Sequence, residues 1–228
     1  MNFKLQEVNS GRDWRRFINL PRSHYEDDPH FVPHLAWERR QFFSDNNPIF
    51  QFTDARFFLA LDPSGRPLGR ISAHVNHHHN EFHDARDGFF GFFESFPNRS
   101  VAEALLGRAE EVLSGFGMQR VLGPFNFSTN EECGMLVRGF DTTPAIMMPH
   151  TKRYYPSLLR ECGYNKAKDL LAYRYDTPEQ VPERVSRLAK RAARRMDVTI
   201  RQIDTDDLER EIERAFKVYA SAWSENWG

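Results

Sequence analysis

The chain has 228 residues, with 31 lysines and arginines against 32 aspartates and glutamates and a net charge of −1. This balance disfavours nucleic-acid binding by the surface as a whole, because such binding depends on neutralising phosphates. The only cysteines, Cys133 and Cys162, predict neither a disulfide framework nor a thiolate metal site. The apolar runs are too short to span a bilayer, and the N-terminus lacks a signal-peptide core. We therefore expect a soluble, cytoplasmic protein.

Strand and helix patterns alternate in the first part of the chain. Ser10 and Asp13 predict the start of a helix. Asp62-Pro63-Ser64-Gly65 predicts the turn of a hairpin, because proline and glycine favour turn geometry. In chain order we expect a strand at 3–8, a helix near 13–18, a helix at 34–43, hairpin strands at 57–61 and 68–75, and a polar loop at 76–87.

A phenylalanine-rich segment at 88–93 follows this loop and is apolar at both odd and even positions, which predicts a strand covered on both faces. Ser100 and Glu103 fit a capping box for a helix over 100–114. Next we expect a strand at 121–127, an extended segment at 145–148, a helix at 155–162 and a strand at 168–175. This order predicts a mixed α/β fold, with a twisted mixed sheet flanked by helices.

The pattern of the chain changes after residue 176. A basic helix is expected at 183–196, and a strand at 198–203 then leads into a long helix, which repeats the design of residues 3–18. We expect one domain over 1–176, and over 177–228 a linker helix and the beginning of a second, similar domain that is truncated. A C-terminal extension packed on the first domain is the alternative.

Short motifs spread over nearly the whole chain point to one protein family. They are Leu20-Pro21, Tyr25, Asp28-Pro29, Val32-Pro33, Asn47-Pro48, Gly69-Arg70-Ile71, residues 88–94, Gly123-Pro124, Gly139-Phe140-Asp141, Tyr154-Tyr155-Pro156 and residues 166–170. These motifs and the element order resemble the GNAT acyltransferase superfamily, and more closely a bacterial family with two tandem GNAT-like domains. The resemblance implies N-acyl transfer and a GNAT-like fold, without assigning a substrate.

The resemblance also implies where an acyl donor binds. In the superfamily, the helix after the fourth strand holds the pyrophosphate of acyl-coenzyme A, which corresponds here to Arg99, Ser100 and Val101. The glycine-containing loop of the superfamily is absent, since residues 95–101 contain no glycine. Arg99 and the free amides of the first turn can still hold a phosphate, because the helix dipole favours an anion. A capped helix without a ligand is the alternative.

Three residues are candidates for acid–base chemistry. Glu94 ends an apolar strand where the resemblance places a general base, and burial would raise its pKa toward a useful range. A solvated residue at a strand end is the alternative. Tyr155 lies one helical turn before Leu159, the position of the general-acid tyrosine in many superfamily members, so it either replaces that acid or belongs to the core. His150 is a third candidate, because it neighbours the expected acyl cleft.

Four polar residues follow the 121–127 strand at every second position: Asn126, Ser128, Asn130 and Glu132. If the strand continues, they form a polar row on one face. Such a row positions an amine and polarises a thioester carbonyl, with Asn126 and Ser128 as the donors. A turn rich in such residues is the alternative. We expect Arg99 and the start of the 100–114 helix to border the largest cleft, facing Asn126 and Ser128.

The histidines between His74 and His83 predict no metal site, because no acidic ligand pattern accompanies them and a solvated loop explains them. Arg184, Arg187 and Arg191 belong to the basic stripe of the 183–196 helix. That stripe is an ordinary solvated face, or it docks an acidic acyl-carrier protein or an anionic membrane surface.

These patterns predict an N-acyltransferase that moves an acyl group from a thioester to an amine. Acyl-coenzyme A or an acyl-carrier protein is expected as co-substrate, with no tightly bound cofactor. The phenylalanine-rich strands are compatible with an apolar groove for a long-chain donor or a lipid-like amine, although excess phenylalanine also serves as core material. The alternative is a non-catalytic GNAT-like binding module that has lost the cofactor loop.

Overall fold

The computed structural model describes residues 2–176, 181–195 and 201–223, apart from the side chain of residue 194. The chain divides into two compact units, residues 1–170 and residues 171–228. Among the described residues, no helix is long and apolar enough to cross a membrane.

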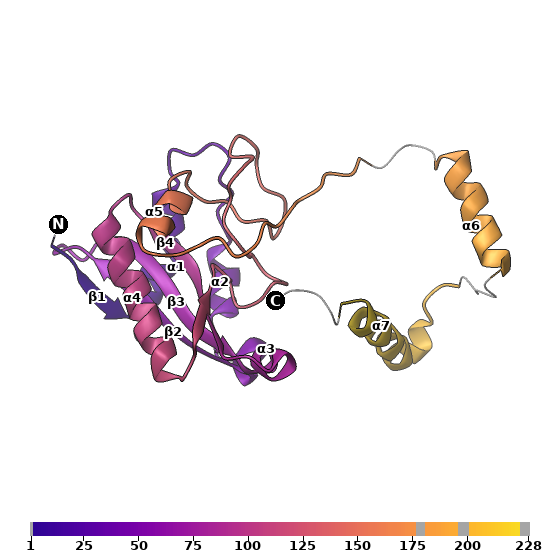
Figure 1. Cartoon of the computed structure of the whole chain (residues 1–228), viewed down its shortest axis with the longest axis horizontal. Coiled ribbons are helices and arrows are strands. Elements are labelled where there is room, and N and C mark those ends of the chain that lie inside the picture. Colours follow the sequence, from indigo (N-terminus) through magenta and orange to yellow (C-terminus); the bar gives the residue numbers. More distant parts are fainter. Residues whose placement is uncertain (1, 177–180, 196–200, 224–228) are drawn as a thin grey trace. The chain divides into compact units, whose positions relative to one another are not determined.

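The first unit is built on one five-stranded sheet in the order β1-β2-β3-β4-β5 (Figure 1). The strands are β1 Lys4–Glu7, β2 Thr53–Leu61, β3 Pro67–Asn76, β4 Asp87–Ser95 and β5 Arg120–Leu122. Neighbours from β1 to β4 pair antiparallel, whereas β4 and β5 pair parallel. The predicted mixed sheet is therefore confirmed.

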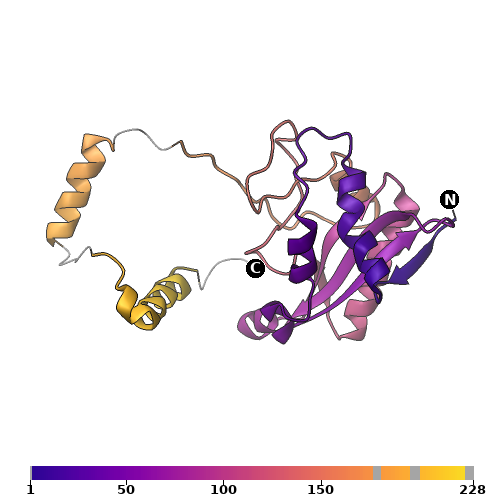
Figure 2. The ribbon, with the colours of Figure 1, turned by 180° about the vertical axis from the view of Figure 1, so that it is seen from behind.

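Helices cover both faces of this sheet. α4 (Arg99–Gly115) and α5 (Tyr155–Glu161) pack on one face, where the apolar side chains of α4 join those of β2, β3 and β4. α1 (Gly11–His24) and α2 (Ala36–Phe42) lie on the opposite face, as the view from behind shows (Figure 2). Phe17 of α1 packs there with Phe57 and Phe92 in an aromatic cluster.

β4 is buried along its whole length, as its phenylalanines predicted. Phe90 and Phe93 belong to the core under α4, whereas Phe92 belongs to the opposite core. Two residues three apart share a face because the strand bulges: Phe92 has φ +49°, and the register with β3 shifts between Arg70 and Ser72. This bulge lies two residues before Glu94.

Three segments differ from their predicted conformations. The strand expected at 121–127 is present at its start, but it ends at Leu122. Residues 145–148 form a turn, in which the Met148 amide donates to the Ala145 carbonyl (3.1 Å). Residues 168–175 are apolar enough to suggest a strand, but they pair with no strand in the described chain. A strand needs a hydrogen-bonding partner, which local composition does not supply.

The segment expected as a polar loop at 76–87 contains a helix, α3 (His77–His83), capped by the side chain of Asn76. His77 pairs with Asp54 (2.8 Å) and His79 with Asp87 (3.3 Å). The described residues contain no group of three or more potential metal ligands.

The predicted capping box at Ser100 and Glu103 is wrong. α4 begins at Arg99, and the Asn98 side chain accepts a hydrogen bond from the Val101 amide (3.3 Å). Asn98 precedes the expected cap by two residues and leaves Ser100 inside the first turn.

The remaining elements of the chain are the 3₁₀ helices η1 (Pro48–Gln51) and η2 (Thr205–Asp207) and the helices α6 (Glu183–Arg195) and α7 (Leu208–Trp223). Of the strand expected at 198–203, the first three residues lie outside the described chain, and 201–203 form no strand. The second GNAT-like domain stays a prediction.

Candidate functional site

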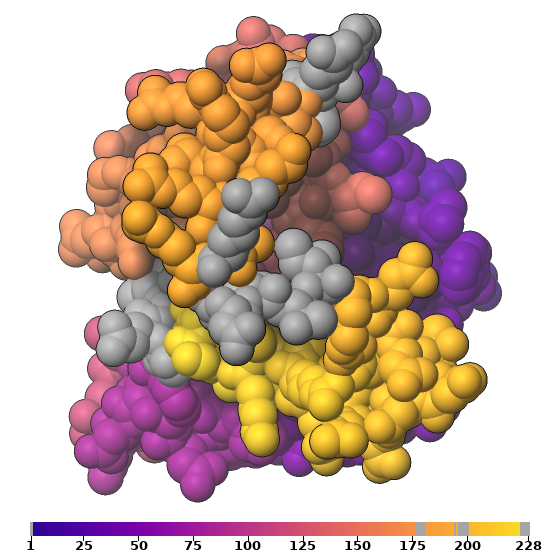
Figure 3. Space-filling model, turned by 90° about the vertical axis from the view of Figure 1, so that its right-hand side faces the viewer, coloured from indigo at the N-terminus to yellow at the C-terminus, as the bar shows by residue number. Residues whose placement is uncertain are grey.

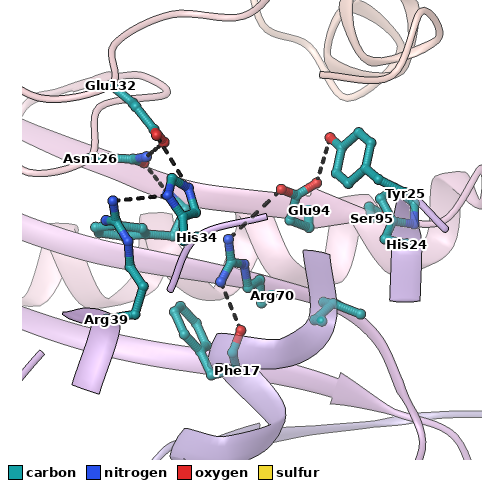
Figure 4. Close-up of polar contacts among 12 residues, drawn as sticks. Phe17, His24, Tyr25, His34, Arg39, Arg70, Glu94, Ser95, Asn126 and Glu132 are labelled. Carbon is teal, nitrogen blue, oxygen red and sulfur yellow. Dashed lines mark hydrogen bonds and ion pairs between the residues drawn. The ribbon is translucent and has the colours of Figure 1, made fainter. Parts of the chain in front are cut away.

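Glu94 lies near the C-terminal end of β4 and is only 8% exposed. Its Oε2 accepts hydrogen bonds from the hydroxyls of Tyr25 (2.9 Å) and Tyr155 (2.6 Å). The Nη2 atom of Arg70 lies 3.8 Å from its Oε1 (Figure 4). The alternative of a solvated residue at the strand end is therefore wrong: Glu94 is a buried carboxylate with two hydrogen bonds to Oε2 and an ion pair at Oε1.

Each partner of Glu94 comes from a different element. Tyr25 directly follows α1, and Tyr155 begins α5. Arg70 lies opposite Glu94 in the register of β3 and β4, and its Nη1 donates to the Phe17 carbonyl (2.7 Å). Two helices and two strands thus converge on one carboxylate, which fixes its orientation.

Burial raises the pKa of Glu94, while the Arg70 charge and the two tyrosine hydroxyls oppose this shift. Burial also raises the pKa of Tyr155, and the negative charge of Glu94 adds to that effect. Glu94 is therefore a carboxylate with increased proton affinity, and it is hydrogen-bonded to Tyr155, which keeps its proton.

Two further side chains extend this cluster. His24 Nε2 lies 3.0 Å from the Tyr155 hydroxyl and 3.2 Å from the Tyr154 hydroxyl. Burial, followed by the charges of Lys152 and Arg70, lowers the pKa of His24 to about 4, so this imidazole is neutral at pH 7. Tyr155 is both a core residue and a member of the cluster.

A second polar group surrounds Asn126. The Asn126 Oδ1 accepts a hydrogen bond from the Phe92 amide (2.7 Å), and its Nδ2 donates to Glu132 Oε2 (2.9 Å). His34 Nε2 lies 3.2 Å from the other oxygen of Glu132. Figure 4 shows this group on one side of Arg70, with Glu94 on the other side.

The predicted polar row on one strand face is wrong. The chain turns after β5, and the Ser128 hydroxyl accepts a hydrogen bond from the Asn130 amide (3.2 Å) within this turn. The alternative of a polar turn is the observed one. The structure joins Glu94 to Tyr155 directly, whereas Asn126 belongs to the second group and Ser128 to the turn.

His150 contacts an aspartate that the sequence analysis did not select as a site residue. Its Nε2 lies 3.0 Å from Asp28 Oδ2, while its buried Nδ1 has no hydrogen-bond partner in the described chain. The ring of Tyr25 lies beside it, with 5.8 Å between the ring centroids. His150 therefore neighbours the Glu94 cluster through Tyr25.

The expected phosphate site at Arg99, Ser100 and Val101 is partly engaged by the protein itself. Arg99 Nε pairs with Glu103 Oε1 (2.7 Å), and the Val101 amide is capped by Asn98.

Two cavities of the first unit lie elsewhere. One of about 670 Å³ is lined by β1, the start of α1 and the 62–65 turn, and one of about 330 Å³ is lined by residues of β2 and its neighbours. Neither is lined by Arg99, Asn126 or Ser128, so the expected cleft is not confirmed.

Sequence reasoning missed three members of the Glu94 cluster. Tyr25 and Arg70 were noted only as parts of family motifs, and His24 was not noted. An arginine in the middle of the 68–75 strand was the available signal, because a buried guanidinium needs a buried acceptor.

No family model matches the chain. The bacterial ceramide synthase of Caulobacter vibrioides is 36% identical over 223 residues, which cover 97% of this chain and 58% of that protein. Protein YghO of Escherichia coli is 34% identical over 217 residues, which cover 95% of this chain and 55% of that protein. The chain thus spans a little over half the length of these curated relatives.

Solved structures of acetyltransferases show weaker similarity. AAC(6')-Iy in complex with a coenzyme A bisubstrate analogue has a TM-score of 0.48 at 13% identity, covering 78% of this chain and 100% of that one. A protein described as a predicted acetyltransferase, with acetyl-CoA, from Clostridium acetobutylicum has a TM-score of 0.46 at 10% identity, covering 76% of this chain and 96% of that one. The topology of the chain itself, with antiparallel β1 to β4 followed by α4 and a parallel β5, confirms the predicted GNAT resemblance at the level of the fold.

Proposed function

We propose that this protein is an N-acyltransferase that moves an acyl group from a thioester to the amine of a lipid-like acceptor. The observation that carries the proposal is the buried Glu94, held by two tyrosines and an arginine near the end of β4. This carboxylate lies four residues beyond Phe90, whose carbonyl still accepts a backbone hydrogen bond from the chain after β5, and the resemblance implies that a GNAT-like sheet admits its thioester where these strands part.

The proposed chemistry moves a proton from the acceptor nitrogen to the leaving thiol. The ammonium of the acceptor loses a proton to Glu94, whose pKa is raised by burial. The amine nitrogen then forms a bond to the thioester carbonyl carbon, and the carbon–sulfur bond breaks. Tyr155 gives its proton to the leaving thiolate and recovers one from Glu94 through their 2.6 Å hydrogen bond. After the carbon–nitrogen bond has formed, the nitrogen loses a second proton to water, so one of its two protons reaches the thiol, the other reaches the solvent, and the enzyme returns to its starting state.

His150 is proposed as a second proton acceptor at the same site. Its contact with Asp28 fixes the ring, and its free Nδ1 is buried next to Tyr25. Asp28 acts as a positioning residue, because a carboxylate beside one ring nitrogen decides which nitrogen carries the proton.

The acceptor is proposed from the name of one relative together with the aromatic interior. A ceramide is the amide of a fatty acid with a long-chain amino alcohol, and the relative from Caulobacter vibrioides bears that activity in its name. The phenylalanines that gather between α1, α2 and the sheet are compatible with a long-chain ligand. We therefore propose a long-chain amine as acceptor.

The donor is proposed to be an acyl-coenzyme A or an acyl-carrier protein. Arg99 at the start of α4 remains exposed and supports a phosphate contact. Arg184, Arg187 and Arg191 are exposed on α6, and Figure 3 shows the side chains of that helix in orange. They are proposed to dock an acidic carrier protein or an anionic membrane surface.

A reaction panel with the full chain tests the proposal. Palmitoyl-coenzyme A and palmitoyl-acyl-carrier protein are each combined with sphinganine or with glucosamine, and amide products are measured by mass spectrometry. We expect N-palmitoyl-sphinganine with at least one donor and little product from glucosamine. Binding of a donor without any amide product would instead support a non-catalytic module, which the missing glycine loop and the Arg99–Glu103 pair favour.

A further inference from the structure

The structure assigns a positioning role to Asn126 and Glu132: this pair clamps the β4 bulge at Phe92 and thereby sets how the acyl donor binds. The inference rests on the proposed function, which names the β4–β5 edge as the donor site. Asn126 contacts the β4 backbone at Phe92 and acts on the site through that backbone.

The clamped backbone has an unfavourable conformation. Phe92 has φ +49°, which side-chain-bearing residues rarely adopt and which persists only where surrounding contacts hold it. The neighbouring backbone is closely packed, because a Cβ built on Gly91 would lie 1.7 Å from the Phe125 carbonyl oxygen and only glycine fits there. The bulge therefore lies directly against the chain that follows β5.

The Asn126 side chain holds this bulge at the point where β4 and the following chain part. The Phe125 amide still donates to the Phe90 carbonyl (2.8 Å), a backbone bond between the two segments. One step further, the Phe92 amide donates to the Asn126 side chain instead (2.7 Å). The amide side chain thus replaces a ladder hydrogen bond and keeps the two backbones at a set separation.

Glu132 decides which way the Asn126 amide faces. Burial alone would raise the pKa of Glu132, but the hydrogen bond of His34, together with the charges of Arg39 and Arg70, lowers the pKa, so the carboxylate is ionised at neutral pH. A carboxylate only accepts hydrogen bonds, so it draws the Nδ2 donor of Asn126 toward itself (2.9 Å). The Asn126 oxygen is left facing the Phe92 amide.

The pair is braced from outside by two further residues. His34 Nε2 lies 3.2 Å from Glu132 Oε1, and Arg39 Nη2 lies 3.1 Å from the other ring nitrogen of His34. A chain of polar contacts thus runs from α2 to the bulge. Because Glu94 lies two residues beyond Phe92 on the same strand, a shift of the bulge also moves the proposed proton acceptor.

A charge swap tests this clamp. Asn126→Asp places two carboxylates together, and we expect the KM for palmitoyl-coenzyme A to rise about tenfold, the effect of losing one ordinary hydrogen bond. The double variant N126D/E132Q restores the pattern, because the introduced carboxylate accepts hydrogen bonds from both the Phe92 amide and the introduced carboxamide. Its KM should return to within about twofold of the original value. Asn46→Asp, at an exposed position, is the matched control and should leave KM unchanged.

Amide hydrogen exchange at Phe92 separates this inference from the proposed function. We expect slow exchange in the unaltered chain and the double variant. Exchange should be fast in Asn126→Asp, because repulsion by Glu132 displaces the introduced carboxylate from the Phe92 amide. If the unaltered chain is inactive but the three proteins show this exchange pattern, the proposed acyl transfer is refuted and the positioning role of Asn126 and Glu132 is supported. Equal exchange in all three proteins, or a double variant as impaired in KM as Asn126→Asp, would overturn the clamp.

Discussion

His74 shows how burial decides the chemistry of a single residue in this protein. It lies within β3, is fully buried and stacks on Phe89, with ring centroids 5.7 Å apart. Its Nδ1 lies 3.2 Å from the Ser72 hydroxyl, whereas its Nε2 has no hydrogen-bond partner in the described chain. Burial lowers the pKa of His74 from 6.5 to about 3, so the folded protein holds this ring neutral.

This shift makes folding stability depend on pH. Between pH 6.5 and about 3 the unfolded chain binds a proton at His74 that the folded chain does not, so stability falls as the pH falls. His74→Gln removes this effect, so the free energy of unfolding should fall less steeply as the pH is lowered. The slopes of the two proteins should differ by up to about 1.4 kcal/mol per pH unit. Urea titrations at several pH values between 7 and 4 measure both slopes. Parallel slopes in the two proteins would refute the assignment.

The sequence predicted single residues of the site better than their partners. The sequence left Glu94 as either a buried base or a solvated residue at a strand end, and burial is observed. Its hydrogen bonds reach across 69 residues to Tyr25 and 61 residues to Tyr155, and no local pattern encodes such pairs. Asn126 was selected as a donor on a strand face, whereas the structure shows no such face and places Asn126 beside β4, where it accepts a hydrogen bond from the Phe92 amide.

At the scale of elements, α4 begins where a side chain satisfies its free amides. Asn98 accepts from the Val101 amide, and Ser100 lies inside the helix. Asn98→Ala should lower the free energy of unfolding by about 1 kcal/mol, the usual cost of losing a helix cap.

Ser100→Ala is the matched control for the α4 cap and should change the free energy of unfolding by less than about 0.5 kcal/mol. Thermal and urea unfolding of the three proteins decide between the caps. A larger loss for Ser100→Ala than for Asn98→Ala would restore the capping box that the sequence suggested.

The predicted elements differ in how far local pattern determines them. β2, β3 and β4 were anticipated because two turns and buried faces define them, and α5 because Gly163 follows it. The conformation of the 168–175 segment was not anticipated. Leu171 and Tyr173 are exposed residues of strand-like composition, but no described strand lies beside them. Pairing is a tertiary property, and composition alone overestimates it.

At the scale of the whole molecule, the first unit contains the sheet and the candidate site, and the second contains α6 and α7. The basic stripe of α6 and the proposed second GNAT-like domain both belong to the part beyond residue 170. The curated relatives are longer than this chain, which matches 58% and 55% of their lengths.

Reversing the charge of the α6 stripe tests whether it binds a partner. The variant R184E/R187E/R191E should lose at least about tenfold in binding to phosphatidylglycerol vesicles or to an acyl-carrier protein, because each arginine near an anionic surface contributes about 1 kcal/mol. The control R12E/R15E/R22E reverses three exposed charges on α1 and should retain binding. Equal binding by both variants would identify the stripe as a solvated face.

The measurement that tests acyl transfer at this site most directly compares Glu94→Gln with Glu111→Gln, an exposed control, using palmitoyl-coenzyme A and sphinganine. Glutamine keeps the shape of the side chain but cannot accept the ammonium proton. We expect kcat to fall about a hundredfold or more in Glu94→Gln, with donor affinity within about twofold of the original and no change in Glu111→Gln. Unchanged kcat in Glu94→Gln at saturating donor, across the pH range, would contradict the account.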